Sequence, residues 1–233
     1  MVFPKAKAND ICVRLSDIII AKVQYCRYLG IFLDYTLNWS HHTNIVYSNL
    51  MKYVGIFYKI KSKLPLSVLK NIYFAFVYRH ILYGIEIYAN TSSIHLKKLI
   101  TLNNKLLRIL QNKLYKFHLE DLYHNFDTLA IPELHIHQML ILVHKFLHHI
   151  LLLPTAFANY FTINSAIHLH NTRVRENLHL DYVSTNYGKM TVRYKASKIW
   201  NKLPSSLKDF FSVKHFNSKL KEFLQVVDID SVI

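Results

Sequence analysis

The chain has 233 residues, of which 52% are apolar or aromatic, and it contains only 4 glycines, 5 prolines and 2 cysteines. A chain of this composition can bury the core of one or two domains, so disordered and collagen-like proteins are excluded. Two cysteines are too few for a disulfide scaffold or a cysteine-rich zinc module. The net charge of +15 attracts polyanions, with nucleic acid first and an anionic membrane surface second.

The positive charge is concentrated in one segment. Residues 52–116 contain twelve basic residues and a single acidic one, Glu86. A smaller excess lies in residues 171–202, which contain seven basic and two acidic residues. Cations that lie close together repel one another, and a bound polyanion reduces this electrostatic repulsion. We therefore expect segment 52–116 to contact a polyanion.

No segment is apolar enough to predict a membrane-spanning helix. The most hydrophobic stretch, residues 139–154, contains Lys145 and three histidines, and nowhere do about 18 uncharged apolar residues follow one another. The N-terminal residues also lack the basic leader and apolar core of a secretory signal peptide. We expect a protein of the nucleus or the cytoplasm that is not secreted.

The first 34 residues have the composition of β-strands. Two short runs rich in β-branched residues, 11–15 and 18–23, are separated by Ser16-Asp17, a candidate two-residue turn. A third apolar run, 28–33, ends at Asp34. We predict a small antiparallel hairpin or sheet here, which is too small to be stable on its own.

From about Ser40 onward, hydrophobic residues recur with a helical period. Pro65 suits the first turn of a helix, and Ser92 or Ser93 can cap another. We predict helices over residues 40–61, 66–89, 93–113, 132–152, 190–201, 205–210 and 213–226. The predicted fold is mainly α: a small N-terminal β-hairpin, a helical bundle and a second helical region.

The predicted helix 93–113 places its cations and its leucines on opposite faces. With about 100° between successive residues, four cations fall within an arc of about 100°, and no acidic residue interleaves with them. They are Lys97, Lys98, Lys105 and Arg108. A solvated face is the plain alternative for one helix, but the preceding segments add further cations. We predict phosphate contacts at these four residues and at Lys59, Lys61, Lys63 and Lys70.

A series of short motifs resembles one protein family in order and spacing. The series begins with Tyr28-Leu29-Gly30-Ile31 and continues through Asp34, Leu37, Trp39 and His42. Later members are Leu64-Pro65, Tyr73, Leu82-Tyr83-Gly84, Asn104-Lys105-Leu106-Leu107-Arg108, Asn171-Thr172-Arg173, Trp200-Asn201-Lys202-Leu203-Pro204, Phe216 and Leu220. Together they resemble the part of a non-LTR (LINE-type, jockey-like) retrotransposon reverse transcriptase that follows its catalytic palm.

This resemblance implies a role for each part of the chain. Residues 1–36 would be the end of the palm, with a primer grip at Tyr28, Leu29 and Gly30. Residues 37–116 would be a basic helical thumb, and residues 117–233 a helical C-terminal extension of unknown role. A thumb holds the template–primer duplex mainly by its backbone, for which cations suffice. RNA or DNA backbone is therefore the expected partner.

The catalytic aspartates of that family are missing from this sequence. The family's palm carries a Phe/Tyr-x-Asp-Asp motif because Mg²⁺ ions must be held for nucleotidyl transfer. This chain has no Asp-Asp pair, and Asp228-Ile229-Asp230 lies outside any matching context. The resemblance thus implies a C-terminal fragment of an RNA-directed DNA polymerase, with no catalytic residue, no metal or other cofactor and no enzyme activity of its own. The magnesium would belong to the absent palm, and the palm and fingers of a full-length polymerase are further expected partners.

Other residue patterns suggest alternatives. A basic helical protein can bind anionic membrane surfaces without crossing them. His137, His144 and His148 share a face of one predicted helix and could present imidazoles to a metal ion. No acidic ligand or cysteine accompanies them, so we expect interfacial histidines of a structural kind instead. Residues expected to pack in the core are Trp39, His42, Trp200, Cys12 and Cys26.

Overall fold

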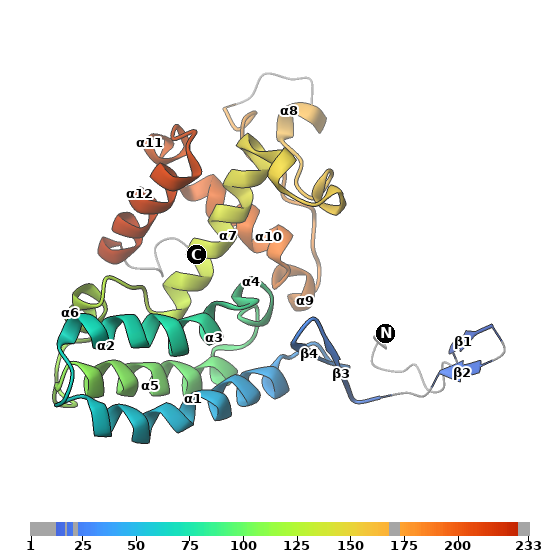
Figure 1. Cartoon of the computed structure of the whole chain (residues 1–233). Helices are drawn as coiled ribbons and strands as arrows, with labels where there is room; N and C mark the ends of the chain where they lie inside the picture. The colour runs from blue at the N-terminus through green and yellow to red at the C-terminus, as the bar shows by residue number, and fades with distance from the viewer. Residues whose placement is uncertain (1–12, 17, 21–22, 168–172, 228–233) are drawn as a thin grey trace.

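A computed structural model describes residues 13–16, 18–20, 23–167 and 173–227 of the chain. These residues are mainly helical, with antiparallel β-hairpins near the N-terminus (Figure 1). The predicted fold class is confirmed. Cys12, Asn171, Thr172 and the segment 228–230 lie outside the described residues.

Two hairpins precede the helices in the described part of the chain. Strand β1 (Val13–Leu15) pairs with β2 (Ile18–Ile20), as predicted, and β3 (Tyr25–Tyr28) pairs with β4 (Ile31–Asp34). The prediction of a single strand over residues 28–33 is wrong, because Leu29-Gly30 forms the turn between β3 and β4. The φ angles of these two residues are positive, 46° and 82°, as tight hairpin turns between twisted strands require.

A first group of helices lies around α5 (Ser93–Leu110). Helix α1 (Ser40–Ile60) runs side by side with α5, and α2 (Leu66–Tyr73) also packs on α5 (Figure 1). Both long helices are predicted, although α5 ends before the predicted limit at 113. Their packing brings basic residues from different parts of segment 52–116 into one bundle.

The predicted continuous helix 66–89 is interrupted twice. Residues Phe74–Tyr78 form a π-helical turn, η1, after which the helix continues as α3 (Arg79–Leu82). It ends there because Gly84 adopts a left-handed conformation with a φ of 70°. A short helix, α4 (Ile85–Tyr88), follows. The apolar residues continue through the break, so their period alone does not predict it.

A second group of helices lies around α7 (Ile131–His148). Helices α10 (Val192–Lys202) and α12 (Val213–Val226) pack on α7, which also contacts α4 (Figure 1). The shorter elements are α6 (Leu119–Asn125), η2 (Ile150–Leu152), η3 (Thr155–Phe157), α8 (Asn164–Ile167), α9 (Asn186–Lys189) and α11 (Ser205–Lys208). The four helices predicted here are present, with ends shifted by at most four residues. Helix α6 is not predicted, because its seven residues are too few for a periodic pattern.

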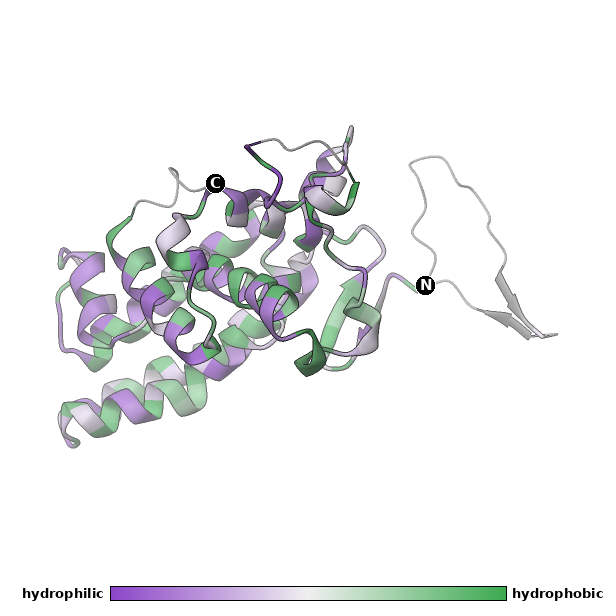
Figure 2. Cartoon of the chain, turned by 90° about the horizontal axis from the view of Figure 1, so that it is seen from above, coloured by the Kyte–Doolittle hydropathy of each residue, from purple (hydrophilic) through white to green (hydrophobic). Residues whose placement is uncertain are grey.

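One continuous hydrophobic core runs through both groups of helices. Its largest fully buried side chains include Phe57, Tyr73, Tyr88, Phe126 and Phe216. Figure 2 shows hydrophobic and hydrophilic residues alternating along the helices, as expected of amphipathic helices that share a core. The rings of Tyr73 and Phe126 meet edge to face at 5.6 Å, which fastens the segment after α6 to α2.

Asp34 shapes the connection from β4 to α1. Its carboxylate accepts hydrogen bonds from the backbone N–H groups of Asn38 at 3.0 Å and Trp39 at 2.9 Å. Trp39 and His42 are buried at the start of α1, and Trp200 is buried in α10. The expectation that these three side chains pack in the core is confirmed.

None of the described helices combines the length and the apolar character needed to cross a membrane. Helix α7 covers much of the hydrophobic stretch at 139–154. It buries apolar side chains against α10 and α12 instead.

Candidate nucleic-acid interface

The basic face predicted for α5 is present in the structure. Lys97, Lys98 and Lys105 are exposed, and Arg108 lies half-buried on the same side. Leucines of the opposite side are buried: Leu99, Leu102, Leu106 and Leu110. Because a helix rises about 1.5 Å per residue, the cations form a row about 16 Å long.

An open groove lies at the C-terminal end of α5. Its volume is about 430 Å³. Cations line it from three places in the sequence: Lys61 just after α1, Lys105 and Arg108 on α5, and Lys113 beyond α5. Other lining residues are Tyr58, Asn104, Asn112 and Tyr115. We call this site the basic groove.

Two cations of the basic groove each lie over a tyrosine ring. Lys61 Nζ is 5.2 Å from the ring centre of Tyr58, and the guanidinium carbon of Arg108 is 5.1 Å from that of Tyr115. Lys61 Nζ also donates a hydrogen bond to Asn112 Oδ1 at 3.0 Å. Rings and amides carry no net charge, so these contacts position the cations without neutralising them.

No carboxylate neutralises these cations within the described part of the chain. The ion pairs found there all lie outside segment 52–116: Asp181 with His179 and Arg193, Lys219 with Glu222, and Lys221 with Asp127. No acidic residue lines the basic groove. The last carbonyls of α5 supply only a partial negative charge. The groove therefore keeps a positive field that a chain of phosphates can neutralise.

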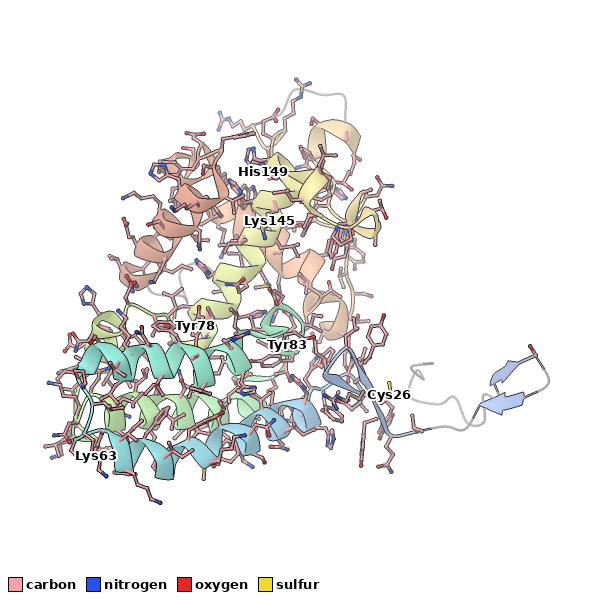
Figure 3. All side chains as sticks on the ribbon, viewed as in Figure 1. Cys26, Lys63, Tyr78, Tyr83, Lys145 and His149 are labelled. Carbon is pink, nitrogen blue, oxygen red and sulfur yellow. The ribbon has the colours of Figure 1, made fainter. Side chains whose placement is uncertain are left out.

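The structure gathers only some of the predicted phosphate contacts. Lys61, Lys105 and Arg108 share the basic groove, and Lys97 and Lys98 extend the row toward the start of α5. The remaining three do not line the groove. Lys59 and Lys63 are exposed at the end of α1 and in the α1–α2 connection (Figure 3), and Lys70 is half-buried on α2.

The predicted phosphate contacts do not include several groove residues, among them the cation Lys113 and the aromatic residue Tyr115. The predicted helix runs to 113, but Asn112 takes a left-handed conformation with a φ of 51°. The N–H of Lys113 then donates a hydrogen bond back to the carbonyl of Arg108 at 2.9 Å. This reversal carries Lys113 and Tyr115 to the groove. Asn112 itself could have indicated the end of the helix in the sequence, because asparagine often adopts this left-handed conformation directly after a helix.

The primer-grip-like residues lie at the tip of the β3–β4 hairpin. Tyr28 and Leu29 are 65% and 72% exposed. The hairpin lies beside the start of α1, whereas the basic groove lies at the far end of this helix (Figure 1). Helix α1 has 21 residues, so about 30 Å of helix separates the two sites.

The tip of the hairpin docks on the break between α3 and α4. The Tyr83 hydroxyl donates a hydrogen bond to the Leu29 carbonyl at 2.5 Å (Tyr83 is labelled in Figure 3). A Cβ on Gly30 would lie 3.4 Å from the Tyr83 ring, and one on Gly84 would lie 2.5 Å from Ile31 Cδ1. Two motifs of the family resemblance, residues 28–31 and 82–84, are thus in direct contact.

The Gly84→Ala variant is expected to lose about 2 kcal/mol of unfolding free energy. Alanine in a left-handed conformation costs about 1–2 kcal/mol, and its Cβ would force the Ile31 side chain to move. Urea denaturation measures the loss.

Gly55→Ala is the matched control. Gly55 lies inside α1, and a Cβ there meets nothing within 4 Å. This variant should gain about 0.5–1 kcal/mol, because alanine loses less conformational freedom in a helix than glycine does. Equal stabilities of the two variants would contradict the docking geometry.

His144 of α7 and His149, which directly follows α7, contact the segment just before α12. His144 Nε2 donates a hydrogen bond to the Phe210 carbonyl at 2.6 Å, and His149 Nε2 donates one to the Phe211 carbonyl at 2.8 Å (His149 is labelled in Figure 3). No group of three or more metal-binding side chains occurs in the described ranges. His144 and His149 contribute hydrogen bonds to the packing of this region.

Comparisons with known proteins give no match. No protein-family model matches the chain, and no curated protein or solved structure is significantly similar to it. The charges and geometry of the basic groove and the docked hairpin are therefore the features that point to a function.

Proposed function

We propose that this protein binds the phosphate backbone of RNA or DNA through the basic groove and the cationic row of α5. The observation that carries the proposal is the convergence of four cations on a groove that no carboxylate lines. Tyrosines at its edge add surfaces on which sugars and bases can pack. Cations that contact phosphates do not distinguish one base from another, so binding is expected to be independent of the nucleotide sequence.

The proposal extends to the family that the motifs resemble. In this view residues 1–36 end a palm and carry the primer grip, residues 37–116 form the thumb, and residues 117–233 form an extension. The chain then holds a template–primer duplex for an RNA-directed DNA polymerase whose catalytic aspartates and Mg²⁺ lie in a separate palm. Support comes from the hairpin: its tip docks on the break between α3 and α4, and its strand β4 contacts α1, the helix that leads to the basic groove.

The test is a triple charge reversal in the basic groove, Lys61→Glu, Lys105→Glu and Lys113→Glu. All three cations line the groove, and none has an ion pair to lose among the described residues. We expect affinity for a labelled duplex in 0.1 M salt to fall roughly 10- to 100-fold. The log–log slope of affinity against salt should become shallower by about 0.9 for each phosphate contact removed. Fluorescence anisotropy measures both quantities.

The matched control reverses three exposed lysines outside segment 52–116: Lys189→Glu, Lys202→Glu and Lys214→Glu. It changes the net charge equally, so it should weaken binding much less and leave the slope nearly unchanged. Equal losses in the two variants would reject the groove as the binding site. Binding to anionic vesicles that excess duplex does not displace would favour the membrane-surface alternative instead.

A further inference from the structure

A second cavity lies away from the basic groove, between the π-helical turn η1, helix α7 and helix α12. Its volume is about 390 Å³, within the range of about 300–1,000 Å³ that is usual for small-molecule pockets. It shares no lining residue with the basic groove. We call it the η1 cavity. The lining residues that set its charge and its aromatic character are Phe74, Tyr78, Asp127, Thr128, His137, Lys145 and Lys221.

The π-helical turn forms an aromatic wall of the η1 cavity. Phe74 and Tyr78 lie at the two ends of the turn, and their rings meet edge to face at 5.0 Å. Such turns interrupt a regular helix and are frequent at functional sites. The wall offers an apolar surface on which a ring of a ligand can pack.

Two lysines line the η1 cavity, and only one of them is neutralised. Lys221 Nζ bonds the carboxylate of Asp127 at 2.5 Å and its carbonyl at 2.6 Å. Lys145, on α7 (Figure 3), is half-buried and has no ion pair among the described residues. Glu86 lies close enough to interact with Lys145 electrostatically, but the two side chains form no direct ion pair in the described structure. Lys145 is therefore the lysine of the cavity whose ammonium has no direct carboxylate partner.

Uncharged hydrogen-bonding groups share the cavity with Lys145. Thr128 is buried, and its hydroxyl has no hydrogen-bond partner in the described structure. Burial lowers the pKa of His137, so this imidazole adds no second charge at neutral pH, and its Nε2 donates to the Asn217 carbonyl at 3.4 Å. Gln138 and Asn217 place side-chain amides in the lining.

We propose that the η1 cavity binds a small aromatic phosphate ester. The ammonium of Lys145 holds the phosphate as a point charge, and the ring packs on Phe74 and Tyr78. An anion suits the cavity because Lys145 can add a charge-assisted contact to it without breaking a direct ion pair. This site is independent of the proposed nucleic-acid binding, since its residues are different.

The test is a titration of the full chain with phenyl phosphate, followed by calorimetry. We expect saturable binding, which Lys145→Gln weakens about tenfold or more because a charge-assisted contact is lost. Lys61→Gln in the basic groove is the matched control and should bind as the original chain does. Inorganic phosphate, which lacks the ring, should bind more weakly, and Tyr78→Leu should reduce the advantage of the ring.

Three results would overturn the proposal. The first is no saturable binding at millimolar phenyl phosphate, and the second is equal affinity in the original chain and Lys145→Gln. The third is displacement of phenyl phosphate by duplex DNA from the triple groove variant. That result would assign the cavity to nucleic-acid phosphates rather than to a free ester.

Discussion

The Asn103→Leu variant is expected to lose about 3 kcal/mol of unfolding free energy. Asn103 is 1% exposed, and its side chain joins three helices. Its Oδ1 accepts a hydrogen bond from the Tyr73 hydroxyl of α2 at 3.0 Å, and its Nδ2 donates one to the Tyr123 hydroxyl of α6 at 3.1 Å. Leucine is similar in size but has neither polar group. Each buried polar group left without a partner costs about 1–3 kcal/mol.

The two hydroxyls are not affected equally. Tyr73 Oη has no other hydrogen bond in the described structure, whereas Tyr123 Oη also donates to Asn104 Oδ1 at 2.5 Å. Most of the loss should therefore come from the Tyr73 hydroxyl. Burial raises the pKa of Tyr73 well above its ordinary value, which agrees with a hydroxyl that has little access to water.

A double-mutant cycle tests this assignment. Adding Tyr73→Phe to Asn103→Leu removes the orphaned hydroxyl, so the double variant should be more stable than the sum of the two single changes by about 1 kcal/mol or more. Urea unfolding followed by circular dichroism gives the four unfolding free energies of the cycle. Strict additivity, or a loss below about 1 kcal/mol for Asn103→Leu, would contradict the network.

The protein is expected to lose stability steeply as the pH falls from about 6.5 toward 3, and His135 should be a main cause. His135 lies on α7 with 7% of its surface exposed, and its Nε2 has no hydrogen-bond partner in the described structure. Burial, followed by the charge of Lys195, lowers the pKa of His135 from 6.5 to about 3. The folded state therefore keeps this imidazole neutral where the unfolded state protonates it.

The sign and size of the effect follow from proton linkage. Between pH 6.5 and the folded-state pKa, the unfolded chain binds one more proton at His135 than the folded chain. Stability from this group is complete above pH 6.5 and falls by about 1.4 kcal/mol per pH unit below it. The loss is about 2–3 kcal/mol by pH 4.5. Burial also lowers the pKa values of His137 and His144, which act in the same direction.

Two variants isolate the contribution of His135. His135→Leu removes the titrating group, so its unfolding free energy should fall less between pH 6.5 and 4.5 than that of the original chain. Lys195→Met removes the second cause of the shift and should have a smaller effect in the same direction. Burial raises the pKa values of Glu86 and Glu133, which opposes the acid loss in every variant alike. Identical pH profiles for His135→Leu and the original chain would reject this explanation.

Periodicity predicted the long helices and the chemistry of their faces. Helices α1, α5, α7 and α12 follow from apolar residues three and four positions apart, because this spacing lies along one side of a helix. The separation of cations and leucines on α5 can be predicted from the sequence of that helix alone. These properties are local, so each can be read from a single segment of the chain.

Single-residue conformations were harder to predict. The turn at Leu29-Gly30 and the break at Gly84 both need positive φ angles, which the surrounding apolar residues do not signal. A glycine in the sequence does not by itself mark such a position, because Gly55 lies inside a regular helix. The docked hairpin supports the left-handed conformation of Gly84, and the sequence does not show that contact.

The amino-acid sequence by itself determined the helical fold class, the basic segment 52–116 and the cationic row of α5. Only the tertiary structure decided which of those cations share a site. Lys61 meets Asn112 from 51 positions away, and the η1 cavity combines Tyr78, Lys145 and Lys221 from three separate elements. Such assemblies depend on how helices pack, and packing is set by side-chain contacts between segments that are distant in sequence.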